Sequence, residues 1–257
     1  MRAAVGIVGT GSLGVALARL QSTPIGEAPV LLSTDLPTDA LAARAPIIVV
    51  EGSADEVLAD LRSLRSHVDG DTILVSTARG VDLKRLRGAA GPGPALFRAV
   101  AISASSPGAD MMILCSQDEP RLDAFGVVLE SLSGVGLCVQ VPEDLLESGM
   151  ALARSALALL TVAMEGIEEG AISDGLPPET ARAFATQTLL TTALLLQHRG
   201  GSPADLKDQV ASPAGTTIAG LAVLEEQGVR GAFIRAMERA ARSDSALRDT
   251  GRPPVVE

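Results

Sequence analysis

The sequence is poor in aromatic residues, with four Phe and neither Trp nor Tyr among 257 residues. Proteins that bind single-stranded nucleic acid stack the bases on aromatic side chains, so this shortage argues against that class. The 21 Lys and Arg against 31 Asp and Glu give a net charge of −10, which disfavours a dedicated surface for nucleic acid or anionic lipid but allows a local basic pocket. We therefore expect neither nucleic acid nor a membrane as a partner.

Cysteine and histidine are also scarce. Cys115 and Cys138 are too few for a disulfide framework and lack zinc-ligand spacing, so we expect both in the core and no metal site. His67 and His198 are isolated among polar neighbours. The N-terminus has no basic leader with a cleavage site, and the longest uncharged apolar stretch, residues 155–164, is too short to span a membrane. These absences predict a cytoplasmic location.

The first half alternates short apolar runs with helical segments. Near-continuous apolar strands separated by helices predict a parallel sheet that is covered on both faces. The expected strands are residues 3–8, 30–33, 47–50, 73–76, 96–102, 111–116 and 136–141. We therefore predict an α/β, Rossmann-like domain with a shortened parallel sheet over residues 1–141.

The second half, residues 142–257, is predicted to be an all-α domain. The expected helices are residues 145–172, 180–198, one opened by SPADLKDQV (residues 202–210) with a cap at Ser202, 216–227 and 230–242. The first of them is apolar around most of its circumference, which is typical of a helix buried on several sides. An array this apolar in so acidic a chain predicts a homodimer or higher homo-oligomer that forms through the helical domain.

A glycine motif follows the first expected strand and opens a helix, which is the context that a dinucleotide fingerprint requires. A carboxylate near the end of the second strand, Asp35, stands 21 residues beyond the motif, where it can bind a ribose 2′-OH and repel a 2′-phosphate. We expect NADH or NADPH as cofactor, with NAD favoured by Asp35. The motif consists of Gly9, Thr10, Gly11, Ser12, Leu13 and Gly14.

A second loop, residues 212–217 (SPAGTT), separates two apolar helical stretches. A helix start leaves backbone N–H groups without partners and attracts negative charge, so this loop can hold an anion. It can equally be a plain cap in which Ser212 or Thr216 satisfies its own backbone. Taken alone, these residues favour the cap.

The glycine motif together with the string LKDQVASPAGTTIAGLAVLEEQGVRGAFIRAMERA, residues 206–240, resembles the pyrroline-5-carboxylate reductase family. The resemblance extends to STARGVDLKRL (residues 76–86), VPEDLLESG (residues 141–149) and GLPPETARAFATQTLL (residues 175–190). It implies a Rossmann domain followed by a helical dimerisation and substrate domain, and reduction of 1-pyrroline-5-carboxylate to proline.

The resemblance also implies roles for particular residues. Backbone N–H groups of the loop would hold the carboxylate of a small cyclic imino acid, and Thr217 would lie beside the imine nitrogen as the catalytic residue. Val50 would border the cofactor, and Ser155 is retained from a family loop at the mouth of the active site. The substrate-binding set is Ser212, Gly215, Thr216, Thr217 and Ser155.

Four segments depart from the family pattern. Residues 100–104 (VAISA) replace Met-Pro-Asn-Thr-Pro, residues 153–159 (ARSALAL) replace Ser-Gly-Ser-Gly-Pro-Ala-Tyr and continue a helix, and residues 50–53 (VEGS) replace Val-Lys-Pro-Gln. The chain between residues 33 and 47 is too short for the helix and third strand of the family. Two alternatives therefore stay open: reduction of a different cyclic imine, or a catalytically inactive, nucleotide-binding dimeric relative with a regulatory role.

Overall fold

The computed structural model describes residues 4–9, 11, 30–102, 110–116, 122–132, 136–211 and 215–250. The chain divides into two compact units, Met1–Met150 and Ala151–Glu257. The first unit is α/β and the second is helical in its described part.

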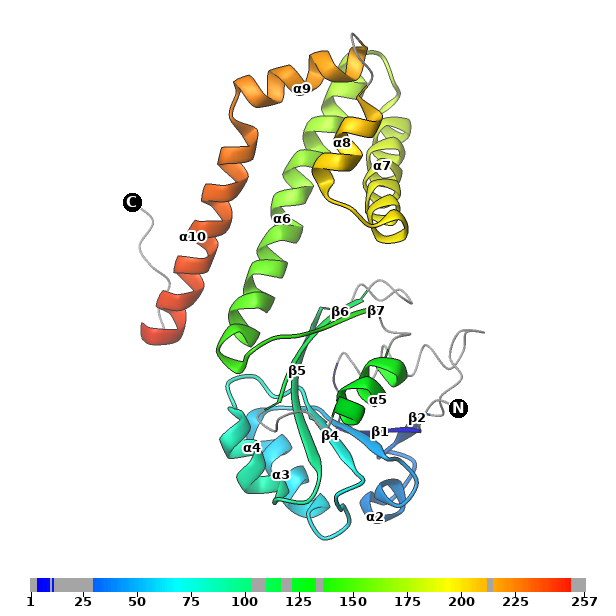
Figure 1. The fold of residues 1–257 in the computed structure, drawn as a ribbon, viewed down its shortest axis with the longest axis vertical. Coiled ribbons are helices and arrows are strands. Elements are labelled where there is room, and N and C mark those ends of the chain that lie inside the picture. The colour runs from blue at the N-terminus through cyan, green and yellow to red at the C-terminus, as the bar shows by residue number, and fades with distance from the viewer. Residues whose placement is uncertain are drawn as a thin grey trace. The chain divides into compact units, whose positions relative to one another are not determined.

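The first unit is built on a seven-stranded sheet (Figure 1) with the order β2-β1-β3-β4-β5-β6-β7. Strands β3 and β4 have the bounds predicted from the sequence, and the other strands differ from prediction by one or two residues. The strands are β1 (Val5–Val8), β2 (Val30–Leu32), β3 (Ile47–Val50), β4 (Ile73–Ser76), β5 (Ala95–Ile102), β6 (Asp110–Cys115) and β7 (Gly136–Gln140).

The sheet is parallel except at one pairing, where β5 and β6 run antiparallel with Arg98 opposite Cys115. Seven residues connect these two strands in the sequence. A parallel return needs a crossover of about a dozen residues or more, so this connection permits only the antiparallel arrangement. The predicted parallel sheet is therefore confirmed except for this pair.

Alternating side chains of the strands build one hydrophobic cluster on each face of the sheet. Helices α2 (Thr38–Ala42), α3 (Ala54–Leu64) and α4 (Leu83–Ala90) contribute to the first cluster, and α5 (Leu122–Leu132) to the second. Figure 1 shows α3 and α4 together on one side of the sheet and α5 on the other. Both faces are covered, as the continuous apolar strands predict.

The stretch between β2 and β3 holds only the short helix α2. Strand β3 pairs directly with β1, and among the described strands β2 lies at the edge of the sheet and pairs with β1 alone. The predicted shortening of this part of the sheet is confirmed. One consequence is that the C-terminal ends of β2 and β3 lie on either side of β1.

Helix α6 (Glu143–Ser173) begins in the first unit and continues into the second. The other helices of the second unit are α7 (Pro178–Arg199), α8 (Pro203–Val210), α9 (Thr216–Glu226) and α10 (Val229–Thr250). Ser202 is the N-cap of α8, as predicted: its hydroxyl accepts from the Asp205 N–H, and Asp205 accepts from the Ser202 N–H. The turn after α6 ends on Gly175, whose φ of +101° is a left-handed conformation suited to glycine.

Many large apolar side chains of the second unit are exposed in the single chain. They occur on α6 to α10, with Leu157, Phe184, Val210, Val223 and Ile234 each more than half exposed. Among the described residues, α6 is also the one helix long and apolar enough to cross a membrane, judged by length and composition. A soluble monomer rarely leaves so much apolar surface uncovered, so this surface requires a covering layer.

Candidate active site

The turn after β1 carries the first two glycines of the motif. Gly9 has a φ of +97°, which residues with a side chain rarely adopt. A Cβ on Gly9 would lie 1.9 Å from the backbone carbonyl oxygen of Glu51, the residue that follows β3. Glycine is therefore required both by the turn and by the neighbouring chain. Thr10, Ser12, Leu13 and Gly14 lie outside the described residues.

The side chain of Glu51 lies against the second glycine of the motif. A Cβ on Gly11 would be 2.4 Å from Glu51 Oε1 and 2.6 Å from its Cδ. Glu51 is only 3% exposed, and its N–H donates to the Val8 carbonyl oxygen at 2.8 Å. The sequence indicates a negative charge in this segment, but its burial against the glycine turn is visible only in the structure.

Asp35 lies in the turn directly after β2 and is exposed. Its carboxylate accepts a hydrogen bond from the Thr34 hydroxyl at 3.3 Å. The same turn is tied to the glycine motif, because the Gly9 N–H donates to the Ser33 hydroxyl at 3.4 Å. The structure thus places Asp35, which is predicted to bind the ribose, and the start of the glycine motif together at the carboxyl ends of neighbouring strands.

The carboxyl end of β1 is the topological switch point of the sheet, because β2, the next strand in the sequence, lies on one side of β1 and β3 lies on the other. In open α/β sheets, dinucleotides bind at such a point, outside the carboxyl ends of the strands. The glycine turn, which has no side chains at Gly9 and Gly11, and the exposed Asp35 fit a dinucleotide. The buried Glu51 carboxylate lies against Gly11 and fills the space that a side chain there would need. Val50 is fully buried in the first cluster, and its carbonyl oxygen accepts a hydrogen bond from the Thr77 N–H at 3.1 Å.

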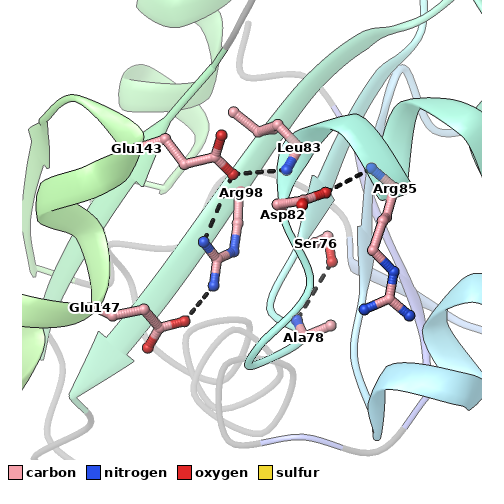
Figure 2. Close-up of polar contacts among 8 residues, drawn as sticks. All are labelled: Ser76, Ala78, Asp82, Leu83, Arg85, Arg98, Glu143 and Glu147. Atoms are coloured by element: carbon pink, nitrogen blue, oxygen red, sulfur yellow. Dashed lines mark hydrogen bonds and ion pairs between the residues drawn. The ribbon is translucent and has the colours of Figure 1, made fainter. Parts of the chain in front are cut away.

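A network of ionic groups, which the sequence analysis did not identify, lies beside the end of β4 and the middle of β5 (Figure 2). Arg98 on β5 is buried and pairs with two acids of the first turns of α6, Glu143 at 3.6 Å and Glu147 in close contact. Glu143 Oε1 also accepts from the Leu83 N–H at the start of α4, at 2.6 Å. Arg98 therefore links β5, α4 and the beginning of α6. The signal that could have found it is a single arginine inside an apolar strand.

Two further contacts hold the segment between β4 and α4. The Ser76 hydroxyl accepts from the Ala78 N–H at 3.3 Å, and Asp82 caps α4 by accepting from the Arg85 N–H at 2.7 Å. The buried Arg98 Nε has no hydrogen-bond partner among the described residues. Opposite Arg98, burial raises the pKa of the Cys115 thiol to about 12, with a smaller contribution from Glu143, so this thiol is protonated and unreactive at neutral pH.

In the second unit, the N-terminus of α9 lies where the SPAGTT loop ends. Gly215 is the N-cap, with extended backbone and no side-chain cap hydrogen bond, and Thr216 and Thr217 are the first two helical residues. Both threonines are exposed. Thr216 therefore does not act as the cap that the sequence allowed, while Ser212 lies outside the described residues. The first N–H groups of α9 are free of a capping side chain within the described part of the chain.

Ser155 lies in the middle of α6, and its hydroxyl donates to the Ala151 carbonyl oxygen of its own helix at 3.0 Å. Helix α6 continues without interruption through residues 153–159, as predicted. Residues 100–102 are the end of β5 and pair with β6. No group of three or more His, Cys, Asp or Glu is placed to hold a metal ion in the part of the chain that the structure describes.

A glycine turn with an exposed acid near it at the switch point of a largely parallel sheet, followed by a unit that is helical in its described part, defines a Rossmann-type protein with a helical C-terminal domain. Residues 143–247 match the family described as pyrroline-5-carboxylate reductase dimerisation. The pyrroline-5-carboxylate reductase of Synechocystis sp. is 34% identical over 193 residues, which cover 75% of this chain and 70% of that protein.

Solved structures share the fold over almost the whole chain. A pyrroline-5-carboxylate reductase from Coxiella burnetii superposes with a TM-score of 0.81 at 23% identity, covering 96% of this chain and 99% of that one. A Plasmodium falciparum pyrroline carboxylate reductase with NADP bound gives 0.63 at 19% identity, covering 95% and 98%. The chain belongs to the pyrroline-5-carboxylate reductase family, and its helical unit is that family's dimerisation domain.

Proposed function

We propose that this protein reduces 1-pyrroline-5-carboxylate to proline, with a nicotinamide cofactor as the hydride donor. The observation that carries the proposal is the start of α9, where no described side chain caps the helix and Thr216 and Thr217 are exposed, in a chain of this family. A helix N-terminus suits a carboxylate, because its free N–H groups and the helix dipole both favour negative charge.

The residues of the chain would divide the work as follows. Backbone N–H groups of Ser212, Gly215 and Thr216 bind and orient the substrate carboxylate. The Thr217 hydroxyl hydrogen-bonds the ring nitrogen, which gains a proton when the C=N bond becomes C–N, and Ser155 contributes to the same substrate site. The cofactor supplies the hydride that adds to the imine carbon.

The glycine turn at Gly9 and Gly11, together with Thr10, Ser12, Leu13 and Gly14, would hold the cofactor, and Val50 would border it. The exposed carboxylate of Asp35 at the end of β2 would bind the ribose 2′-OH, which favours NADH over NADPH. Comparison of kcat/KM for the two cofactors tests this preference. A value that is higher for NADPH than for NADH would contradict the role of Asp35.

The activity is tested by mixing the purified protein with 1-pyrroline-5-carboxylate and either cofactor, and following the loss of absorbance at 340 nm together with the formation of proline. We expect turnover with at least one cofactor. Nucleotide-saturated protein that produces no proline with either cofactor would refute the proposal and leave the inactive, regulatory relative as the better description.

The role of Thr217 is tested by Thr217→Ala, with Thr217→Ser as the variant that restores the hydroxyl and Thr192→Ala, an exposed position on α7, as the control. Loss of a group that assists proton transfer costs about a hundredfold in rate. We expect that loss in kcat for Thr217→Ala alone. A wild-type kcat for Thr217→Ala would remove Thr217 from the site.

A different cyclic imine is a second candidate substrate, favoured by the uninterrupted α6 at residues 153–159 and the strand at residues 100–102. Arg154 is exposed on α6 and can contact a carboxylate or phosphate. A panel of cyclic imines with and without a carboxylate distinguishes the substrates. Arg154→Ala should raise KM for the acidic imines only if this arginine binds them.

We also propose a division at residues 141/142 into a dinucleotide-binding domain and a helical dimerisation and substrate domain, and a cytoplasmic homodimer in which a second copy covers the apolar side chains of α6, α7, α9 and α10. The support is the dimerisation-family match and the exposure of those side chains. Light scattering after gel filtration should give at least twice the chain mass of 26.2 kDa. A monomer at micromolar concentration would contradict this assembly.

A further inference from the structure

We propose that Arg79, in the loop between β4 and α4, is a specificity-determining residue that binds an anionic group of the bound ligand. The group is the carboxylate of the imino acid or a phosphate of the nucleotide, since a guanidinium forms paired hydrogen bonds with either. The inference deepens the proposed function and rests on it, because it needs a ligand that lies over the carboxyl ends of the strands.

The loop, residues 77–82, starts from a fixed position at the end of β4. The Thr77 N–H donates to the Val50 carbonyl oxygen at 3.1 Å, which ties the loop to the end of β3. The Ser76 hydroxyl accepts from the Ala78 N–H at 3.3 Å, and both of these residues are buried. The first two residues of the loop are therefore held against the sheet.

The end of the loop is held by the ionic network around Arg98 (Figure 2). The Leu83 N–H donates to Glu143 Oε1 at 2.6 Å, and Glu143 pairs with the buried Arg98. Asp82 accepts from the Arg85 N–H at 2.7 Å and so caps α4. The network that joins β5 to the start of α6 therefore also positions this loop.

Between these fixed ends, Arg79 and Gly80 form an exposed turn. Gly80 has a φ of +70°, and a Cβ on it would have no heavy atom within 4 Å beyond its chain neighbours, so the space beside the turn is open. Arg79 has no hydrogen-bond or ion-pair partner within the described residues. Its charge is therefore available to a ligand and is not used to hold the fold.

The turn lies at the edge of the sheet where a dinucleotide is expected. Strands β1, β3 and β4 are parallel neighbours, so their carboxyl ends lie side by side at intervals of about 4.8 Å. Asp35, which is predicted to bind the ribose, lies on the β2 side of β1, so the nicotinamide and the substrate beside it are expected on the β3 and β4 side. In the described parts of the loops that follow β1 to β4, Arg79 is the one cationic residue.

The experiment compares Arg79→Met, which removes the charge, with Arg79→Lys, which keeps the charge but loses the planar fork of the guanidinium. Steady-state kinetics with 1-pyrroline-5-carboxylate and with 1-pyrroline, the same ring without the carboxylate, tests for a contact with the carboxylate. The Kd of NADH, measured by its fluorescence in a protein without Trp or Tyr, tests for a contact with phosphate. The control is Arg62→Met, because Arg62 is also exposed but lies in the last turn of α3, toward the amino ends of the strands.

We expect Arg79→Met to raise KM for 1-pyrroline-5-carboxylate about tenfold, which corresponds to the loss of one charged hydrogen bond, while kcat, KM for 1-pyrroline and the Kd of NADH stay unchanged. A tenfold rise in the Kd of NADH instead would support the proposal with phosphate as the bound group. Arg79→Lys should lie between Arg79→Met and the wild type, and Arg62→Met should equal the wild type. Wild-type constants for Arg79→Met, or an equal rise in KM for both imines, would overturn the proposal.

Failure of this inference and failure of the proposed function give different results. A wild type that makes proline, with Arg79→Met unchanged in every measurement, retains the function and refutes the inference. A wild type that makes no proline refutes the function. The inference is then tested by the Kd of NADH and by calorimetric titration with L-proline and pyrrolidine, and it fails if Arg79→Met binds NADH and L-proline as the wild type does.

Discussion

Arg98 is more buried than either of the acids that neutralise it, and this difference predicts an unequal response to mutation. Its side chain is 6% exposed, whereas those of Glu143 and Glu147 are 28% and 23% exposed. Removal of the arginine leaves two carboxylates that can be hydrated. Removal of both carboxylate charges leaves a guanidinium charge buried between β5 and the start of α6.

The magnitudes follow from that asymmetry. An uncompensated buried charge costs about 3 kcal/mol or more, which is the expected loss for Glu143→Gln/Glu147→Gln. Arg98→Met replaces the cation by an apolar side chain of similar length and leaves the acids near water, so it should cost about 1 kcal/mol. The double variant that keeps the arginine is therefore expected to be the less stable one.

The thiol of Cys115 reports on this region, because it lies opposite Arg98 in the sheet and is 1% exposed. In a Cys138→Ala background, the rate at which a disulfide reagent labels Cys115 measures how often the strands open. The predicted losses correspond to labelling about a hundredfold faster for the double glutamine variant and about fivefold faster for Arg98→Met.

Asp55→Asn/Asp71→Asn serves as the control, because it also removes two acidic charges from the first unit, at exposed positions. Its labelling rate should stay within about twofold of the background protein. Faster labelling of Arg98→Met than of the double glutamine variant would refute the reasoning, since it would mean that the acids, and not the arginine, carry the uncompensated charge.

Two further predictions concern the same unit. Gly80 has a φ of +70° with open space around it, so Gly80→Ala should lower the free energy of unfolding, measured in urea, by about 1 kcal/mol. Gly9→Ala should lower it by about 3 kcal/mol or more, because the new Cβ would strike the Glu51 carbonyl. Equal losses for the two variants would show that β1 and β3 can move apart to accommodate the Cβ. Burial raises the pKa of Cys115 to about 12 from an ordinary 9.0, so the unfolded chain loses this proton first and stability should fall as the pH rises above 9. Cys115→Ala should show a smaller alkaline loss by circular dichroism, and an identical loss would assign the effect to other groups.

Local patterns in the sequence predict the elements of this protein well. Residues 47–50 and 73–76 are apolar runs bounded by Pro, Asp or Gly, and both are strands with the predicted bounds. The cap at Ser202 follows from a short side chain three residues before Asp205. Such features depend on neighbours within a few positions, so the sequence alone is enough to place them.

Other features were not predicted because they join distant parts of the chain. The sequence does not reveal which residues pair with Arg98, because its partners Glu143 and Glu147 are 45 and 49 positions away on another element. The antiparallel pairing of β5 and β6 depends on the length of one connection and on which neighbour each strand finds. Glu51 is visible in the sequence as a reversed charge, but its contact with Gly11 arises only when β1 and β3 pair.

By itself, the sequence determined the succession of strands and helices, the glycine turn and the membership of the family, because periodicity, caps and motifs depend on residues that are close together in the sequence. Only the tertiary structure decided which charges became buried and against what, since burial is a property of packed elements. That is why the acid pressed against the nucleotide turn and the arginine shared by two acids of α6 emerge from the fold.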